Sequence, residues 1–210
     1  MTVEGSVVVT NSLDVAALAT VCVVTGNLTV EANGLIALSL PVLESVGGVS
    51  INSNSTLTSI SLPVLASVAG VVVISGNAAL TSISLPALAS AGGVFIAFNP
   101  ALTTFSLPLL ESAAGFVSIQ ENFALTSISL PLLASVGGNV VISGNAALTS
   151  ISLPVLASVA GFVSIGDNDA LTTISLPVLA SVAGFVSIES NPALTICTGA
   201  LIVNVGDCVQ

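Results

Sequence analysis

This sequence contains no lysine, arginine or histidine, and its ten acidic side chains give it a formal net charge of −10. Proteins that bind nucleic acid neutralise phosphates with lysine and arginine, so the composition excludes nucleic acid as a partner. Anionic membrane surfaces attract basic segments and are excluded for the same reason. Because tyrosine is also absent, acid–base chemistry is limited to carboxylates and thiols.

Long hydrophobic runs are missing as well, although 54% of the residues are hydrophobic. A membrane-spanning helix needs about 20 consecutive apolar residues, whereas Gly, Ser, Asn or Thr interrupts this chain every few positions. We therefore predict no membrane insertion. The first residues, Met1 to Gly5, contain neither a basic nor an apolar region, so no signal peptide is predicted within this chain.

Cysteine occurs only three times. Cys197 and Cys208 lie close together near the end of the sequence, where a disulfide would lock the last turn of the chain. Free thiols are the alternative. Cys22 is left without an obvious partner, and three cysteines do not by themselves indicate a compartment.

A repeat of 22 to 23 residues dominates the sequence. The tripeptide Ser-Leu-Pro recurs seven times, and an asparagine follows with the same spacing. One such unit cannot bury its own apolar side, so units must stack, with about 4.8 Å between successive coils. The prolines are at positions 41, 63, 86, 108, 131, 154 and 177.

Each unit contains a Val-x-Ile segment whose alternation predicts a short strand. Two further elements precede this strand, and we expect Leu148, Ile151, Leu153, Leu156 and Val159 to point inward. Proline is expected at a corner, and glycine at the turn before the strand. The predicted parallel strands are 7–9, 28–30, 49–51, 72–74, 94–96, 117–119, 140–142, 163–165, 186–188 and a further one at 201–203.

These features predict a single all-β domain over residues 1–210, a right-handed parallel β-solenoid of about ten coils. Residues 1–27 form the N-terminal cap and first coil, 28–194 the repeats and 195–210 the C-terminal cap. Within the first part, residues 11–19 are rich in alanine and leucine and begin with a capping residue, which predicts a short helix.

The asparagine column is predicted to be structural. Stacked amides at a turn satisfy one another and the backbone of the next coil, whereas a ligand-binding row would need supporting chemistry nearby, which the sequence lacks. This Asn ladder comprises Asn54, Asn77, Asn99, Asn122, Asn145, Asn168 and Asn191.

Two stretches resemble a known family. Residues 148–168, LTSISLPVLASVAGFVSIGDN, and residues 5–30, GSVVVTNSLDVAALATVCVVTGNLTV, are similar to the receptor L-domain. This leucine-rich-repeat-like β-helix occurs in receptor ectodomains, fungal cell-wall anchored proteins and bacterial surface proteins. The resemblance covers roughly residues 5 to 197. It implies a right-handed β-helix, an extracellular or cell-surface location and no enzymatic activity, and it carries over no functional residues.

No catalytic residues are predicted, because no base is present to activate a serine and the equivalent residues Glu44 and Glu111 lie three coils apart, at roughly 14 Å, which is beyond glycosidase spacing. No cofactor is expected. Asp167, Asp169 and Glu189 lie near the asparagine turns of adjacent coils and form a weak Ca²⁺ candidate. The alternative is that these acids are solvated loop residues that keep the protein soluble.

Hydroxyl side chains form regular columns on the predicted outer surface, which we interpret as a Thr/Ser face. Small and β-branched residues suit tightly stacked coils, so this pattern has a purely structural explanation. The functional explanation is a surface for adhesion or recognition, for ice, for a crystalline polysaccharide, or for self-assembly into an extracellular fibre or sheath. The columns are Thr58, Thr81, Thr103, Thr126, Thr149 and Thr172, with Ser61, Ser84, Ser106, Ser129, Ser152 and Ser175.

Overall fold

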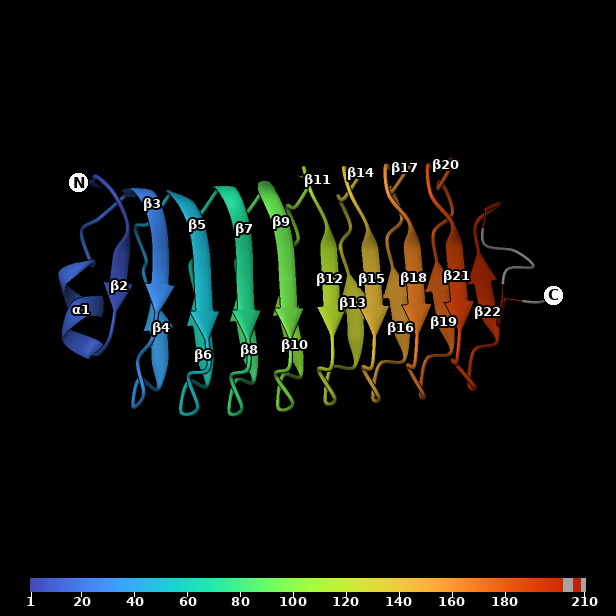
Figure 1. Cartoon of the computed structure of the whole chain (residues 1–210), viewed down its shortest axis with the longest axis horizontal. Helices are drawn as coiled ribbons and strands as arrows, with labels where there is room; N and C mark the ends of the chain where they lie inside the picture. Colours follow the sequence, from blue (N-terminus) through green and yellow to red (C-terminus); the bar gives the residue numbers. More distant parts are fainter. Residues whose placement is uncertain (202–205, 209–210) are drawn as a thin grey trace.

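The computed structural model describes residues 1–201 and 206–208. The chain forms a β-solenoid of about nine turns, close to the ten predicted, and only 3% of it is helical. Successive turns stack along one axis, so α1 (Ser12–Ala17) and β22 (Ile196–Thr198) lie at opposite ends of an elongated molecule (Figure 1). The strands of neighbouring turns pair in parallel, which confirms the predicted fold class.

The largest sheet has 14 strands and contains all nine Val-x-Ile segments predicted between residues 7 and 188. The tenth predicted strand, 201–203, extends outside the described residues. The strands of this large sheet are β1 (Thr2–Val3), β2 (Val7–Val9), β3 (Val23–Val30), β5 (Ser45–Asn52), β7 (Ser67–Ser75), β9 (Ser90–Ala97), β11 (Ser112–Ala113), β12 (Val117–Gln120), β14 (Ser135–Val136), β15 (Val140–Ser143), β17 (Ser158–Val159), β18 (Val163–Gly166), β20 (Ser181–Val182) and β21 (Val186–Glu189).

The opposite side of the solenoid consists of two four-stranded sheets, in the orders β10-β8-β6-β4 and β13-β16-β19-β22. Because β2 pairs with β3 and β22 pairs with β19, the stack of coils extends into both predicted cap segments. The strands are β4 (Ala37–Ser39), β6 (Ser59–Ser61), β8 (Ser82–Ser84), β10 (Thr104–Ser106), β13 (Ser127–Ser129), β16 (Ser150–Ser152), β19 (Thr173–Ser175) and β22 (Ile196–Thr198).

The core lies between these sheets and consists almost entirely of leucine, isoleucine and valine. Each of the five residues predicted to point inward, from Leu148 to Val159, is 2% exposed or less. The proline follows the small strand in a turn, where the N–H of Leu156 donates to the carbonyl of Leu153 (3.3 Å). Proline therefore occupies a corner at which its missing N–H is not needed, as predicted.

The glycine column lies at the predicted turn before the Val-x-Ile strand, and the structure shows why glycine is needed there. Gly161 and its equivalents do not adopt positive φ angles. Instead, a Cβ on Gly115 would lie 2.6 Å from the carbonyl oxygen of Gly92, and one on Gly184 would lie 3.0 Å from that of Gly161. The backbones of adjacent coils approach so closely at this corner that only glycine fits.

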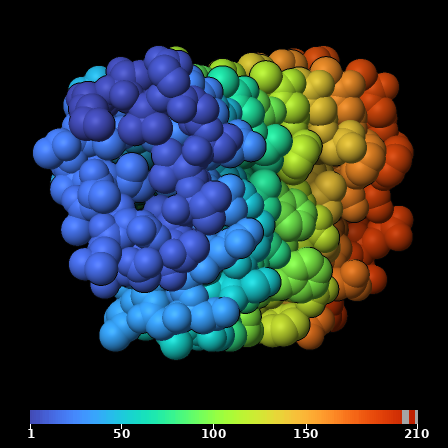
Figure 2. All heavy atoms as spheres, turned by 60° about the vertical axis from the view of Figure 1, so that its left-hand side comes forward, coloured from blue at the N-terminus to red at the C-terminus, as the bar shows by residue number. Residues whose placement is uncertain are grey.

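The N-terminal end of the stack is covered by the predicted helix, α1 (Ser12–Ala17). Asn11 is its N-cap and accepts hydrogen bonds from the N–H groups of Leu13 (2.8 Å) and Asp14 (3.2 Å). Asp14 in turn accepts from the N–H of Asn11 (3.2 Å), which completes a capping box. Figure 2 shows the N-terminal atoms lying across this end of the solenoid.

Candidate binding surface

The outer side of the two small sheets carries regular hydroxyl groups, and we call it the hydroxyl face. In five of the eight strands, namely β6, β8, β13, β16 and β19, a buried isoleucine such as Ile151 separates two outward serines or threonines, such as Ser150 and Ser152. Parallel pairing places these side chains in register: Ser127, Ser150 and Thr173 form one column, and Ser129, Ser152 and Ser175 form the next. Two rows of hydroxyls therefore run along the axis with about 4.8 Å between coils.

The predicted threonine column lies beside these rows, and it is exposed except for Thr58, which is half-buried. Its hydroxyl groups bind the backbone of the preceding coil: Oγ1 of Thr149 donates to the carbonyl of Thr126 (2.9 Å), and Oγ1 of Thr172 donates to that of Thr149 (3.0 Å). The column thus has a structural role that the sequence analysis left open. An external ligand would meet the methyl groups and the remaining hydroxyl lone pairs.

The hydroxyl face is interrupted at its centre, because the two small sheets end at β10 and β13 in adjacent coils. Phe105 occupies the middle of β10, at the position where other coils have isoleucine. Phe105 is only partly buried, whereas Ile83 and Ile128 are 2% and 1% exposed. We attribute the break to the larger ring, which does not fit the space that isoleucine fills.

No charged residue occurs in the eight strands of the hydroxyl face, all of which the structure describes. The acidic residues lie instead at turns, at strand ends and near the termini. Residues 45–110 and 122–166 contain no charged side chain at all. Apart from Glu111 and Glu121, the middle of the solenoid is therefore uncharged, although the protein has a high net negative charge.

The Asn ladder is present, and its asparagines are 0–2% exposed. Oδ1 of each asparagine accepts hydrogen bonds from the previous coil: Oδ1 of Asn145 accepts from the backbone N–H (3.1 Å) and from Nδ2 (3.4 Å) of Asn122. Nδ2 of Asn122 also donates to the carbonyl of Ile96 (2.9 Å). Each amide satisfies groups that burial would otherwise leave unpaired, so the structural prediction for this column is confirmed.

The sequence analysis missed the residue that ends the ladder. Oδ2 of Asp207 accepts from the backbone N–H of Asn191 (2.6 Å) and from its Nδ2 (3.3 Å). In the bonds between successive rungs, each amide donates to the next one towards the C-terminal end, so a carboxylate, which only accepts, is suited to the last position. At the other end the N–H of Ala32 donates to Oδ1 of Asn54 (2.7 Å).

A column of left-handed residues, which the sequence analysis also missed, comes directly before the ladder. These residues have φ angles between 53° and 69° in successive coils. Two of them are glycines, which adopt this conformation without strain, whereas the other five carry side chains that disfavour it. Because the residue types differ, no sequence pattern revealed the column, which comprises Ser53, Gly76, Phe98, Glu121, Gly144, Asp167 and Ser190.

The disulfide between Cys197 and Cys208 is formed, as predicted, with 5.6 Å between the Cα atoms. It joins the last strand to the segment that carries Asp207. All three cysteines lie in the described part of the chain, and Cys22 is a free, half-buried thiol. The amino group of Met1 lies 3.6 Å from its sulfur atom.

The weak Ca²⁺ candidate does not form a metal site. Among the residues that the structure describes, no three acidic or cysteine side chains lie close enough to hold a metal ion. Asp167 and Asp169 are exposed on either side of the buried Asn168, and Glu189 lies at the end of β21, opposite Gly166. The turn geometry therefore separates the carboxylates instead of converging them.

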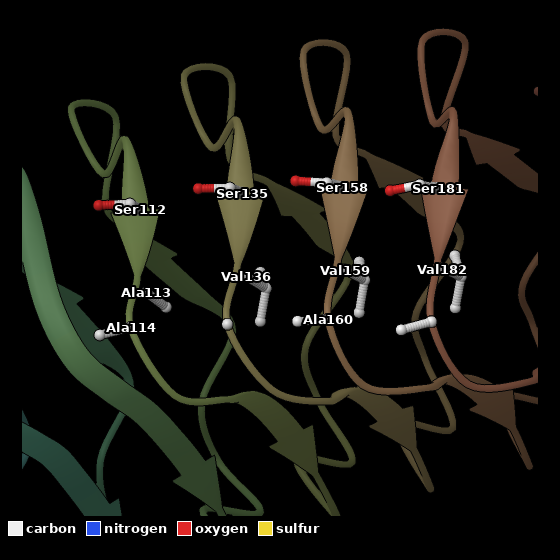
Figure 3. A pocket seen from close by; sticks show the side chains of 12 residues that line it. Ser112, Ala113, Ala114, Ser135, Val136, Ser158, Val159, Ala160, Ser181 and Val182 are labelled. Carbon is white, nitrogen blue, oxygen red and sulfur yellow. The ribbon is translucent and has the colours of Figure 1, made fainter.

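A groove runs along the solenoid beside the hydroxyl face, and the sequence analysis did not predict it. It lies where each coil bends between its short Ser-Val strand and the Val-x-Ile strand. Figure 3 shows Ser112, Ser135, Ser158 and Ser181 in one row along it. Its two sections have volumes of about 500 Å³ and about 390 Å³.

No protein-family model, curated protein or solved structure matches this chain. The described part of the chain also contains no helix of the length and apolarity that crossing a membrane requires.

Proposed function

We propose that this chain is a non-enzymatic recognition module that binds an uncharged, hydroxyl-rich, repetitive surface such as a polysaccharide. The observation that supports this proposal is the pair of in-register hydroxyl columns on the small sheets. Serine hydroxyls both donate and accept hydrogen bonds, as sugar hydroxyls do. A rigid row of such groups at a fixed spacing favours a ligand that repeats along one direction.

Electrostatics supports an uncharged ligand. A polyanion would be repelled by the net charge of −10. A polycation would be drawn to the carboxylates at the turns and ends of the solenoid, away from the hydroxyl face. The resemblance to the receptor L-domain favours an extracellular or cell-surface location, where polysaccharides are exposed.

Binding is tested by co-sedimentation with insoluble cellulose and chitin. The double variant Ser129→Glu/Ser152→Glu places two like charges on adjacent strands of the hydroxyl face, and we expect it to lose binding. The control variant Ser164→Glu/Ser187→Glu introduces the same charges at the same coil spacing on the outer side of β18 and β21. Equal binding by both variants, or no binding by the unmodified protein, would reject the proposal.

Ice is a second candidate, because the exposed threonine column presents methyl groups at regular spacing on the same side. The engagement of the threonine hydroxyls by backbone carbonyls and the interruption at Phe105 both reduce the ordered area that is available. Thermal hysteresis separates this candidate from the first. Hysteresis that Thr126→Glu/Thr149→Glu abolishes, without cellulose or chitin binding, would favour ice.

A further inference from the structure

A row of exposed aliphatic side chains runs along the corner next to the groove, and we call it the aliphatic ridge. In each coil the sequence Leu-Pro-x-Leu forms a turn in which the last N–H donates to the first carbonyl, as from Leu65 to Leu62 (3.3 Å). The residue after proline stands at the tip of this turn. The ridge comprises Val64, Leu109, Leu132, Val155 and Val178, which are exposed, and Val42 and Ala87, which are half-buried.

The ridge is distinguished by the regular spacing of its exposed residues along the axis. Its five largest members beyond Val42 are 40–49% exposed, and they occur in consecutive or nearly consecutive coils. Single exposed apolar residues need no explanation, whereas a continuous apolar patch on a protein surface indicates an interaction site. The ridge therefore requires a partner with an elongated, apolar and uncharged recess.

The groove on the same molecule has these properties. Its lining consists of small residues, namely serine, alanine, glycine, valine and one threonine, and none is charged. The ridge follows the solenoid axis and repeats once per coil, and so does the groove. A second copy of this chain is therefore a suitable partner. Its ridge repeats at the coil spacing, which is also the spacing of the groove, so every turn tip can meet an equivalent recess.

We propose that two copies associate side by side, with the ridge of each seated in the groove of the other. Ridge and groove are adjacent within one coil: Val155 is at the ridge, and Ser158 and Ala160 line the groove. A twofold axis parallel to the solenoid axis therefore places the ridge of each copy opposite the groove of the other, so that both contacts form at once and the assembly closes at a dimer.

The area reaches the lower limit for a specific dimer. Seven coils span about 30 Å along the axis, and the seven residues from Pro154 to Ala160 span about 20 Å across it. Such a strip corresponds to roughly 600 Å² on each copy, at the lower limit for specific interfaces. The area per copy is small, which predicts a reversible dimer.

Charge predicts a dependence on salt. Each copy carries a net charge of −10, so association brings together molecules of like charge, which dissolved salt screens. Near the ridge only Glu44 and Glu111 are charged, because the corresponding position in the other coils, such as Ala157, is alanine. The dimer is therefore expected to strengthen as the salt concentration rises.

Sedimentation equilibrium of the full chain at low and high salt tests the proposal. We expect the unmodified protein to form a dimer, and we expect Leu132→Glu/Val155→Glu on the ridge to raise the dissociation constant by roughly tenfold or more. Filling the groove with Ala114→Phe/Ala160→Phe should do the same. The control Val8→Glu/Ile36→Glu changes residues that are 53% and 65% exposed but lie outside ridge and groove, and it should leave the dimer intact.

Circular dichroism establishes that each variant retains the β-solenoid. A dimer lost with the ridge variant but not with the groove variant would overturn ridge-in-groove packing. A monomer at all concentrations and salt conditions, an assembly larger than a dimer, or equal loss with the control variant would overturn the proposal as a whole.

Discussion

Asp207 accepts two hydrogen bonds from Asn191, one from the backbone N–H at 2.6 Å and one from Nδ2 at 3.3 Å. These bonds end a chain of buried amides that begins at Asn54. The adjacent Cys208 is joined to Cys197 on the last coil, so the disulfide holds the carboxylate in place. Ladder and disulfide thus close the same end of the solenoid together.

Replacing Asp207 with alanine should destabilise the C-terminal coil by about 1–3 kcal/mol, because two donors of Asn191 lose their acceptor. Asp207→Asn keeps an acceptor oxygen of the kind that every other rung has, and it should retain most of the stability. Urea denaturation of the two variants measures the difference. Equal stability of the alanine variant and the unmodified protein would show that the contact does not hold the end of the ladder.

Replacing Phe105 with isoleucine should join the two small sheets, because isoleucine fills this position in the coils on either side. We expect a gain of about 1 kcal/mol from the restored strand pairing and packing. Amide hydrogen exchange is the direct measurement: the N–H groups of β13 and the adjoining residues should become more protected. Unchanged exchange there would mean that another feature separates β10 from β13.

Replacing Gly115 with alanine should be strongly destabilising, by about 2 kcal/mol or more, because the new Cβ would lie 2.6 Å from the carbonyl oxygen of Gly92. Gly93 provides the matched control, since it lies at the same corner and a Cβ there would approach nothing closer than 3.3 Å. Thermal unfolding compares the two variants. Similar melting temperatures would contradict the steric explanation of the glycine column.

The N-terminal cap should weaken in acid. The hydrogen bond from the N–H of Thr10 (2.7 Å), with those from its hydroxyl and from Asn11, lowers the pKa of Asp14 below its ordinary value of 3.8. Because the pKa is lowered, the ionised carboxylate stabilises the folded cap fully at pH values above the ordinary pKa. This stabilisation is lost as the pH falls through the lowered pKa of the folded state. NMR titration of the α1 amides should follow this change, and Asp14→Asn should remove it.

The sequence alone determined the solenoid, because the interval between prolines such as Pro131 and Pro154 gives the length of a coil, and alternation around Ile151 gives its inner and outer sides. It also predicted the burial of the asparagines and the pairing of Cys197 with Cys208. The coil length, the inward positions and the asparagine column follow from the repeat, and the cysteine pairing follows from the short separation of the two residues in the sequence.

Only the tertiary structure decided what depends on the fit between coils. Asp207 lies outside the repeat, so its place below Asn191 follows from the path of the last turn. Phe105 matches the apolar pattern of the sequence, and only the folded coils show that it is partly buried where one small sheet ends. The groove is made by the bend of each coil, and it adjoins the aliphatic ridge because both follow the same axis. The sequence pattern reveals which side chains point inward, whereas side-chain volume and the distance between coils decide which of them fit.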